Sequence, residues 1–300
     1  YYEGQAATEH MSWYGDYQES RWKAALEAGK EFLRLNKENG DYYRVENTGN
    51  PREDYINGYF TKGNREVVMA SFRWGVYAKG NKGFRMFDQG YGIPRGNHAD
   101  MFLWHDGSKF DWNNPEHKSN PYANRDPRLA MSILTNNVEF KDRTIEAWTG
   151  GRDGKGVIHA TRTGYYIYKF IDPNLDLLQN RTSVHHWVIM RYAEILLSYA
   201  EAMNEAYGPT GNVGYRLNAV RALNQVRNRV GVEMPAVPTA ISKEELREKI
   251  RNERRVELAF EDHRFWDVRR WMIAPETLGT PLRGVEITKI SDEEFEYKPI

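Results

Sequence analysis

Two glutamates four residues apart, Glu253 and Glu257, have a spacing that could support chemistry. Carboxylates at positions i and i+4 lie on one face of a helix and can approach the ~5 Å separation of a retaining glycosidase pair. A helix is expected here because Ser242 and Glu245 form a capping box, in which each side chain satisfies a backbone donor of the other residue. An acid/base pair is therefore one hypothesis.

The same helix face favours a structural role for these carboxylates. At 100° per residue, Leu246, Ile250 and Phe260 fall on the stripe that carries both glutamates, which indicates packing rather than a cleft. A buried carboxylate needs a cationic partner, and arginines are abundant nearby. We predict an ion-pair network and no catalytic residue. The expected members are Glu253, Arg254, Glu257, Arg264 and Arg269.

A second candidate site lies where regular periodicity disappears, between residues 75 and 128. The stretch is rich in Gly, Asn, Asp and Pro yet carries many aromatic residues, and long irregular segments inside domains are usually functional. An indole can lie on the C–H face of a sugar while Asp and Asn bind its hydroxyls. The predicted oligosaccharide site comprises Trp74, Trp104, Trp112 and Trp148, with Asp106, Asp111, Asn113 and Arg125 as polar partners. The alternative is that these aromatic residues fill a loop-rich surface.

Metal and phosphate chemistry find little support. His98, Asp100, His105 and Asp106 could supply ligands, but no predicted helix or hairpin fixes their geometry. The glycine-rich loop at 148–156 is no P-loop, because Gly156 follows Lys155 where Ser or Thr should bind magnesium. We expect no metal and no cofactor.

The elements that must position these residues are mainly helical. Apolar spacing predicts helices over 14–36, 187–206 and 217–230 and another from Ser242, with a short helix over 126–135. Residues 40–62 are predicted to form a loop, 65–74 a buried strand or a helix, and 165–170 a strand. We divide the chain into a helical segment (1–60), a loop-rich region (61–185) and a helical scaffold (186–300). The helix pairs are typical of tetratricopeptide-like hairpins, although no strict 34-residue period is visible.

Composition excludes several classes of function. The 300 residues balance 42 basic against 42 acidic side chains without a long basic tract, so a nucleic-acid partner is not expected. The absence of cysteine removes disulfides and thiol chemistry, and no apolar run approaches the ~20 residues of a membrane span. Aromatic residues are abundant, with 19 Tyr, 12 Phe and 9 Trp, while mean hydropathy is only −0.78. Some of these rings are therefore expected to meet a ligand.

Several motifs resemble the SusD/RagB family of outer-membrane glycan-binding lipoproteins. The strongest is the pair IRNERRVELAFE (250–261) and HRFWDVRRW (263–271), preceded by RYAEILL (191–197), YAEA (199–202) and LNQVR (223–227). DPRL (126–129) and GYY (164–166) occupy places where such proteins carry similar motifs. The resemblance covers most of residues 120–275, while the earlier part agrees only in character.

The resemblance implies a non-catalytic protein that captures an oligosaccharide or polysaccharide and passes it to a SusC-like TonB-dependent transporter. It implies an outward-facing position at the outer membrane, with membrane contact only through a lipid anchor that this chain does not contain. The family's glycan contacts come from variable loops, so the resemblance assigns no site residue. A glycoside hydrolase using a carboxylate pair and a tetratricopeptide-like scaffold for protein partners remain the alternatives.

Overall fold

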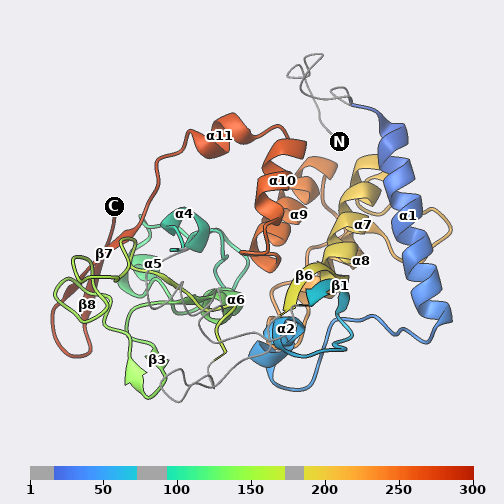
Figure 1. Ribbon diagram of the computed structural model, residues 1–300. Coiled ribbons are helices and arrows are strands. Elements are labelled where there is room, and N and C mark those ends of the chain that lie inside the picture. The colour runs from blue at the N-terminus through green and yellow to red at the C-terminus, as the bar shows by residue number, and fades with distance from the viewer. Residues whose placement is uncertain (1–16, 73–92, 173–185) are drawn as a thin grey trace, which may run out of the picture. The chain divides into compact units, whose positions relative to one another are not determined.

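The computed structural model describes residues 17–72, 93–172 and 186–300, which divide between two compact units (Figure 1). The first unit comprises Tyr1–Asn47, Gly63–Ala70 and Val188–Pro281, and the second comprises Thr48–Lys62, Ser71–Trp187 and Leu282–Ile300. Each unit therefore combines segments that are far apart in sequence. Helices predominate, and every sheet in the described parts has two strands.

The first unit is a set of packed helices (Figure 1). They are α1 (Glu19–Glu38), α7 (Tyr192–Tyr207), α8 (Ala219–Arg227), α9 (Lys243–Glu257), α10 (His263–Arg270) and α11 (Ala274–Leu278). Helix α7 packs against α1, α8 and α9. Fully buried side chains from these helices, such as Leu26, Leu196, Leu223 and Ile250, form one core. The expectation of a mainly helical fold is confirmed.

Helix α9 begins as its capping box predicts. The backbone N–H of Glu245 donates to Ser242 Oγ at 3.1 Å, and the Ser242 N–H donates to Glu245 Oε2 at 3.1 Å. The helix ends at Glu257, however, and Phe260 takes a left-handed conformation with φ of 66°. The prediction that Phe260 continues the buried helical stripe is therefore wrong, because the chain turns before it.

The segment before α7 also differs from expectation. Residues 187–191 were expected to be helical, but they belong to strand β6 (His186–Arg191), which pairs with β1 (Val67–Phe72). The 65–74 segment, left open between strand and helix, thus contains a strand. Val188 and Ile189 are β-branched and suit a pleated strand, so the available partner strand overrides a pattern that also fits a helix.

The second unit opens with a helix, α2 (Pro51–Phe60), where a loop was predicted. Asn50 caps it by accepting from the backbone N–H of Glu53 at 3.3 Å, and Pro51 occupies the first helical position. Proline is favoured there because its missing N–H would have had no partner. The Asn-Pro pair at 50–51 therefore marks a helix start.

The rest of the second unit consists of short elements joined by long loops. The helices are α4 (Gly96–Ala99), α5 (Pro115–Ser119) and α6 (Arg128–Ser132). The strands pair antiparallel: β2 (Ile133–Leu134) with β5 (Tyr166–Ile167), β3 (Glu139–Phe140) with β4 (Arg143–Thr144), and β7 (Val285–Lys289) with β8 (Phe295–Pro299). Residues 126–135 thus form a helical turn followed by a strand. No helix in the described ranges is both long and apolar enough to cross a membrane.

Candidate functional site

The two glutamates of α9 are buried in ion pairs. Glu257, fully buried, accepts from Arg191 Nη1 at 2.6 Å and from Arg229 Nη2 at 3.0 Å. Glu253, 1% exposed, accepts from Arg227 Nη1 at 2.8 Å. Neither carboxylate can reach a substrate, so the acid/base hypothesis has no support at this pair.

The ion-pair network exists, but its members differ partly from those predicted. Arg254 contacts Asp267 at 3.2 Å rather than either glutamate. The guanidinium of Arg269 lies 3.7 Å from the ring centroid of Phe265, and that of Arg264 lies 5.9 Å from Trp271. Within the described part of the chain these two arginines contact aromatic rings and form no ion pair. Local arginines were expected to neutralise the glutamates, whereas the actual partners come from α8, its C-terminal loop and β6.

In the second unit, Trp104 and Arg125 lie in a buried stack. Trp104 is 4% exposed, and its ring centroid lies 4.1 Å from that of His117. His117 in turn stacks on Phe110 at 5.5 Å, and the Arg125 guanidinium lies 3.8 Å from the Phe110 centroid. Trp104 therefore presents no free face to solvent, and its placement argues against a direct contact with a sugar.

Arg125 is fully occupied by backbone carbonyl groups. Its guanidinium donates to the oxygens of Ala99, Phe102 and Pro121 at 2.6–3.0 Å. Burial lowers the pKa of this guanidinium to about 10, which still leaves it charged at neutral pH. Arg125 thus ties two loops together and is not available as a polar partner of a ligand.

Trp112 is half-buried, and both a hydrogen bond and an aromatic contact hold its ring. Its indole N–H donates to Asp100 Oδ1 at 3.0 Å, and Phe110 packs edge-on against its ring at 5.0 Å. The edge-on contact with Phe110 and the hydrogen bond to Asp100 fix the orientation of the ring, so the exposed part of the indole is preorganised. This residue keeps its candidate role.

The predicted polar partners are exposed, but several of their atoms already cap turns. Asp106 Oδ1 accepts from the Ser108 N–H at 2.8 Å, and Asp111 Oδ1 accepts from the Asn113 N–H at 2.9 Å and from Asn113 Nδ2 at 3.0 Å. Such side-chain turns shape loops. Because all three residues are exposed, their other polar atoms could still bind hydroxyls.

Trp148 lies on a loop that the glycines close tightly around it. An added Cβ on Gly151 would lie 2.9 Å from the indole Nε1, and one on Gly154 would lie 1.9 Å from the carbonyl oxygen of Trp148. Only glycine allows the backbone to approach this closely. The glycine-rich sequence at 148–156 is thus explained by the close packing of the loop around an indole.

A buried carboxylate and the C-terminal hairpin hold this loop in place. Asp153 receives two hydrogen bonds from the Arg143 guanidinium at 2.6 and 2.7 Å and one from the Glu146 N–H at 2.9 Å. The Arg143 bonds offset the burial of this carboxyl, and its pKa stays below the ordinary value. The Thr149 N–H donates to the carbonyl of Ile287 at 2.9 Å, which fixes the loop to β7.

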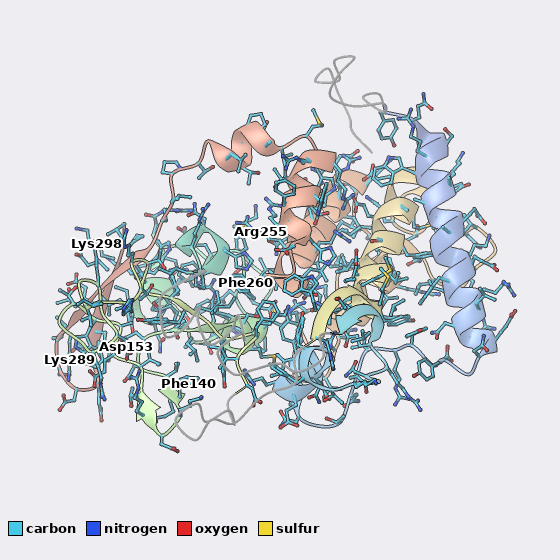
Figure 2. The ribbon with its side chains drawn as sticks, viewed as in Figure 1. Phe140, Asp153, Arg255, Phe260, Lys289 and Lys298 are labelled. Carbon is cyan, nitrogen blue, oxygen red and sulfur yellow. The ribbon has the colours of Figure 1, made fainter. Side chains whose placement is uncertain are left out.

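Two residues of the hairpin complete the surroundings of Trp148, and sequence reasoning missed both. The ring of Phe295 lies 5.3 Å from that of Trp148 at an angle of 33°, and Lys289 Nζ lies 5.0 Å from the indole centroid. Figure 2 shows Lys289 on the hairpin and Asp153 on the neighbouring loop. Trp148 and Phe295 are both half-buried and form an aromatic surface with a cation beside it. The alternating Val285, Ile287 and Phe295 to Tyr297 pattern was the available signal for this hairpin.

The predicted tryptophans do not form one continuous platform. No ring contact joins Trp148 to Trp104 or Trp112 within the residues that the structure places. The aromatic contacts that continue from Trp148 run instead from Phe295 to Tyr297 at 6.5 Å and from Tyr297 to Tyr122 at 5.3 Å. Trp74 lies outside the described residues. The candidate site therefore has two parts, one at Trp148 and Phe295 and the other at Trp112.

The candidate metal ligands do not gather into a metal site. In the described ranges, no group of three or more His, Asp or Glu side chains is arranged to hold an ion.

A mainly helical chain that carries half-buried aromatic residues on rigid loops defines a class of ligand-binding scaffold, and the comparisons with known proteins identify the family. The SusD family matches residues 2–298. The chain therefore belongs to the SusD family.

Several relatives share this fold. A solved SusD-like carbohydrate binding protein of Bacteroides fragilis is similar with a TM-score of 0.71 and 23% identity, over 91% of this chain and 53% of that chain. A second SusD-like protein of that species has a TM-score of 0.71 and 27% identity, over 93% of this chain and 56% of the other. SusD-like protein P2 of Formosa agariphila is 34% identical over 120 residues, 38% of this chain and 22% of the relative. This chain spans about half the length of the two solved relatives.

Proposed function

We propose that this chain is the glycan-binding part of a non-catalytic cell-surface protein that captures an oligosaccharide on Trp148, Phe295 and Trp112. The observation that carries the proposal is the half-buried Trp148–Phe295 pair, held by a loop whose glycines and buried Asp153 leave it little freedom. Preorganised rings bind a sugar face without an entropic cost for ordering. Membership of a family whose members are typically non-catalytic glycan-binding proteins supports the same function.

The chemistry of the site favours capture over hydrolysis. The glutamate pair considered for acid/base chemistry, Glu253 and Glu257, is buried among arginines, and the exposed Asp106 and Asp111 cap turns. An aromatic ring contributes about 1 kcal/mol of stacking, so two or three rings give about 2 to 3 kcal/mol, and hydrogen bonds to the sugar hydroxyls bring the affinity to about the millimolar range. Such weak binding suits a protein that must release its cargo.

We further propose, from family membership, that the captured glycan passes to a SusC-like TonB-dependent transporter and that the whole protein faces outward from the outer membrane. Helices α7 and α8, joined by a loop from Gly208, would then serve as a tetratricopeptide-like hairpin in the supporting scaffold.

The first test is the retention of a glycan panel by affinity electrophoresis. Trp148→Ala should weaken retention about tenfold, which corresponds to about 1.4 kcal/mol, and Phe295→Ala and Trp112→Ala should weaken it by smaller factors. Trp266→Ala is the matched control, because this tryptophan is 63% exposed on α10 of the first unit. Unchanged retention in both Trp148→Ala and Trp112→Ala, with folding confirmed by circular dichroism, would remove this site.

A reducing-sugar assay on the same panel separates binding from catalysis. A binding protein leaves the chain length of a retained glycan unchanged, whereas a hydrolase releases new reducing ends. Release that persists in a Trp148→Ala variant would point to a catalytic centre elsewhere in the chain.

A further inference from the structure

The first unit contains a groove that the proposed function does not use. It has a volume of about 790 Å³, within the range of typical small-molecule sites. The end of α1, the start of α7, the outer face of α8 and the loop at 214–217 form its walls. The residues that matter for its chemistry are Lys37, Asp41, Tyr192, Tyr215, Arg216, Arg221, Gln225 and Asn228.

Two tyrosines supply the aromatic part of the groove. Tyr192 and Tyr215 are half-buried, and each packs against another ring, Phe32 at 6.5 Å and Tyr199 at 6.3 Å respectively. Neither phenol oxygen has a hydrogen-bond partner within the described ranges. Burial raises the pKa of Tyr192 to about 12 and raises that of Tyr215 as well, so both hydroxyls stay protonated and can donate.

Unpaired cations surround these rings. Lys37, Arg216 and Arg221 are exposed, and none of them forms an ion pair with any residue that the structure describes. Arg221 is oriented by a hydrogen bond of 3.0 Å from its Nη1 to the carbonyl oxygen of Arg216. Among the described residues that line the groove, Asp41 is the only one with a carboxylate. The groove therefore has an excess of positive charge.

The lack of partners distinguishes these cations from others on the same unit. On the outer face of α1, Lys30 pairs with Glu27 at 3.1 Å and Arg34 pairs with Glu31 at 2.7 Å. A helix surface normally neutralises its basic side chains with such i,i+3 and i,i+4 neighbours. At the groove the positions that could hold glutamate carry Gln225, one turn after Arg221 on α8, and Asn228, the residue that follows the helix.

The side-chain amides that line the groove differ in whether they already have hydrogen-bond partners. Asn224 is occupied, because its side chain donates to the carbonyl of Val237 and accepts from the N–H of Val237, both at 2.9 Å. Gln225 and Asn228 are exposed, and their side-chain amides have no such partner within the described residues. They can therefore donate to and accept from hydroxyl groups in the groove.

We propose that this groove is a second carbohydrate site, selective for an oligosaccharide that carries carboxylate or sulfate groups. The guanidinium groups of Arg216 and Arg221 bind the anion, since a planar fork of donors matches both groups. The phenols and amides bind ring hydroxyls, and the tyrosine faces contact the sugar ring. This inference rests on the proposed function for the class of ligand, and it adds a site that distinguishes charged from neutral glycans.

The test is calorimetric titration of the whole 300-residue chain with three probes: trigalacturonic acid, a sulfated carrageenan oligosaccharide and a neutral galacto-oligosaccharide. The groove should bind at least one anionic probe, with affinity falling about tenfold or more between 50 mM and 500 mM NaCl because exposed charges are screened. The two anionic probes show which group the site prefers. The proposal would be overturned if the neutral probe bound as tightly as the anionic probes and if the variants described below did not weaken that binding.

The variant that tests the groove is the double substitution Arg216→Gln and Arg221→Gln, which should weaken binding of the anionic probe at least tenfold. Tyr215→Phe should weaken it by a smaller factor. The matched control is Lys30→Gln with Arg34→Gln, which removes two paired cations of α1 and should leave binding unchanged. An unchanged affinity in the Arg216/Arg221 variant, at an unchanged melting temperature, contradicts the proposal.

Two further arms separate the possible outcomes. Trp148→Ala should not alter the affinity for the anionic probe. If Trp148 proves unnecessary for glycan retention while the anionic probe still binds the groove, the proposed function is wrong and this inference stands. A short polyglutamate peptide serves as a competitor. If it displaces trigalacturonic acid with equal or higher affinity, the groove recognises an acidic peptide and the carbohydrate assignment is wrong.

Discussion

Two acids of α7, the buried Glu201 and the half-buried Glu194, show how a side chain's partners decide its ionisation. Glu201 accepts from Arg270 at 2.6 Å and from Trp271 Nε1 at 2.6 Å, and these contacts outweigh burial and lower its pKa. Glu194, seven residues earlier, has no hydrogen-bond partner for Oε2 in the described structure, and burial raises its pKa to about 7. Glu201 is the more deeply buried of the two and yet has the lower pKa, so the hydrogen-bond and ion-pair partners decide the difference.

Glu194 and His263 are close but do not form an ion pair at neutral pH. His263 Nδ1 lies 3.6 Å from Glu194 Oε1, beyond normal hydrogen-bond distance. Burial lowers the pKa of His263 and raises that of Glu194, so both groups are driven toward their neutral forms. The other charged groups that influence Glu194 are Arg254, Glu261, Arg191 and Asp267.

Glu194→Gln should therefore stabilise the protein at alkaline pH. Between the ordinary carboxyl pKa of 4.5 and about 7, the folded state keeps a proton on Glu194 that the unfolded state has released, so stability falls as pH rises through this window. The glutamine variant does not lose this stability, so its free energy of unfolding should exceed that of the wild type by about 1 to 3 kcal/mol at pH 8 and by less at pH 5. Urea unfolding at both pH values measures it.

Glu201→Gln is the matched control, and the opposite sign is expected for it. This substitution removes a charge that Arg270 requires, so the variant should lose stability at pH 8. His263 lies 3.6 Å from Glu194 and is coupled to it, so the comparison that decides is the one at pH 8, where the His263 imidazole, whose pKa burial lowers, is neutral in both proteins. A Glu194→Gln variant that is less stable than wild type at pH 8 would contradict the assignment of a raised pKa.

The residue scale also shows what helical spacing could and could not predict. Periodicity placed Glu253 and Glu257 on the buried face of α9, and both are buried. Their partners Arg227 and Arg191 lie 26 and 66 residues away in sequence. Spacing along a helix specifies a face, but the group that packs on that face depends on how distant segments fold back. The partners were therefore not predictable from local sequence.

At the scale of elements, the 148–154 loop depends on glycine for steric reasons. Gly154→Ala should destabilise the loop, because its Cβ would lie 1.9 Å from the carbonyl oxygen of Trp148 and the backbone would have to move. Overpacking of this kind costs about 1 to 3 kcal/mol. We expect a lower melting temperature together with weaker glycan retention, since the displaced backbone carries the Trp148 indole.

Gly156→Ala separates steric conflict from backbone conformation. Gly156 has φ of 101°, yet an added Cβ would meet nothing within 4 Å, so only the conformational cost of about 1 kcal/mol applies. The Gly156 variant should keep glycan retention while the Gly154 variant loses it. Equal retention by both variants would mean that the loop does not position the indole.

Elements with local start signals were predictable, and elements that depend on a distant partner were not. The capping box at Ser242 and Glu245 predicted the start of α9, and the apolar spacing of 14–36 predicted most of α1. Asn50-Pro51 is also a local start signal, but its loop-forming composition led to the wrong prediction for α2. The pairs β1–β6 and β2–β5 form between segments that are far apart in the chain, so no single window of sequence contains them, whereas hairpin β7–β8 has a local alternating pattern that the prediction missed.

At the scale of the whole chain, a buried charge cluster joins two of the three sequence segments of the first unit. Glu66 comes from the segment Gly63–Ala70, while Arg191, Arg229, Glu257 and Glu261 come from Val188–Pro281. Arg191 contacts Glu66 at 2.7 Å and Glu261 at 2.9 Å, and Arg229 contacts Glu66 at 2.6 Å. The segment Gly63–Ala70 thus depends on these ion pairs for its position in the unit.

Arg191→Met should therefore destabilise the first unit severely. The substitution leaves Glu66, Glu257 and Glu261 buried with too few cations, and removing one partner of a buried pair costs about 3 to 5 kcal/mol. Urea unfolding should show a lower midpoint, and hydrogen exchange should rise in β1 as well as in α9, because Glu66 directly precedes β1.

The control is Arg34→Met, which removes an exposed pair with Glu31 and should change stability by less than about 0.5 kcal/mol. A second variant, Arg191→Met with Glu257→Met, removes one of the stranded acids and should recover part of the loss; if it is no more stable than Arg191→Met alone, the cost lies in packing around Arg191 and not in unpaired charge.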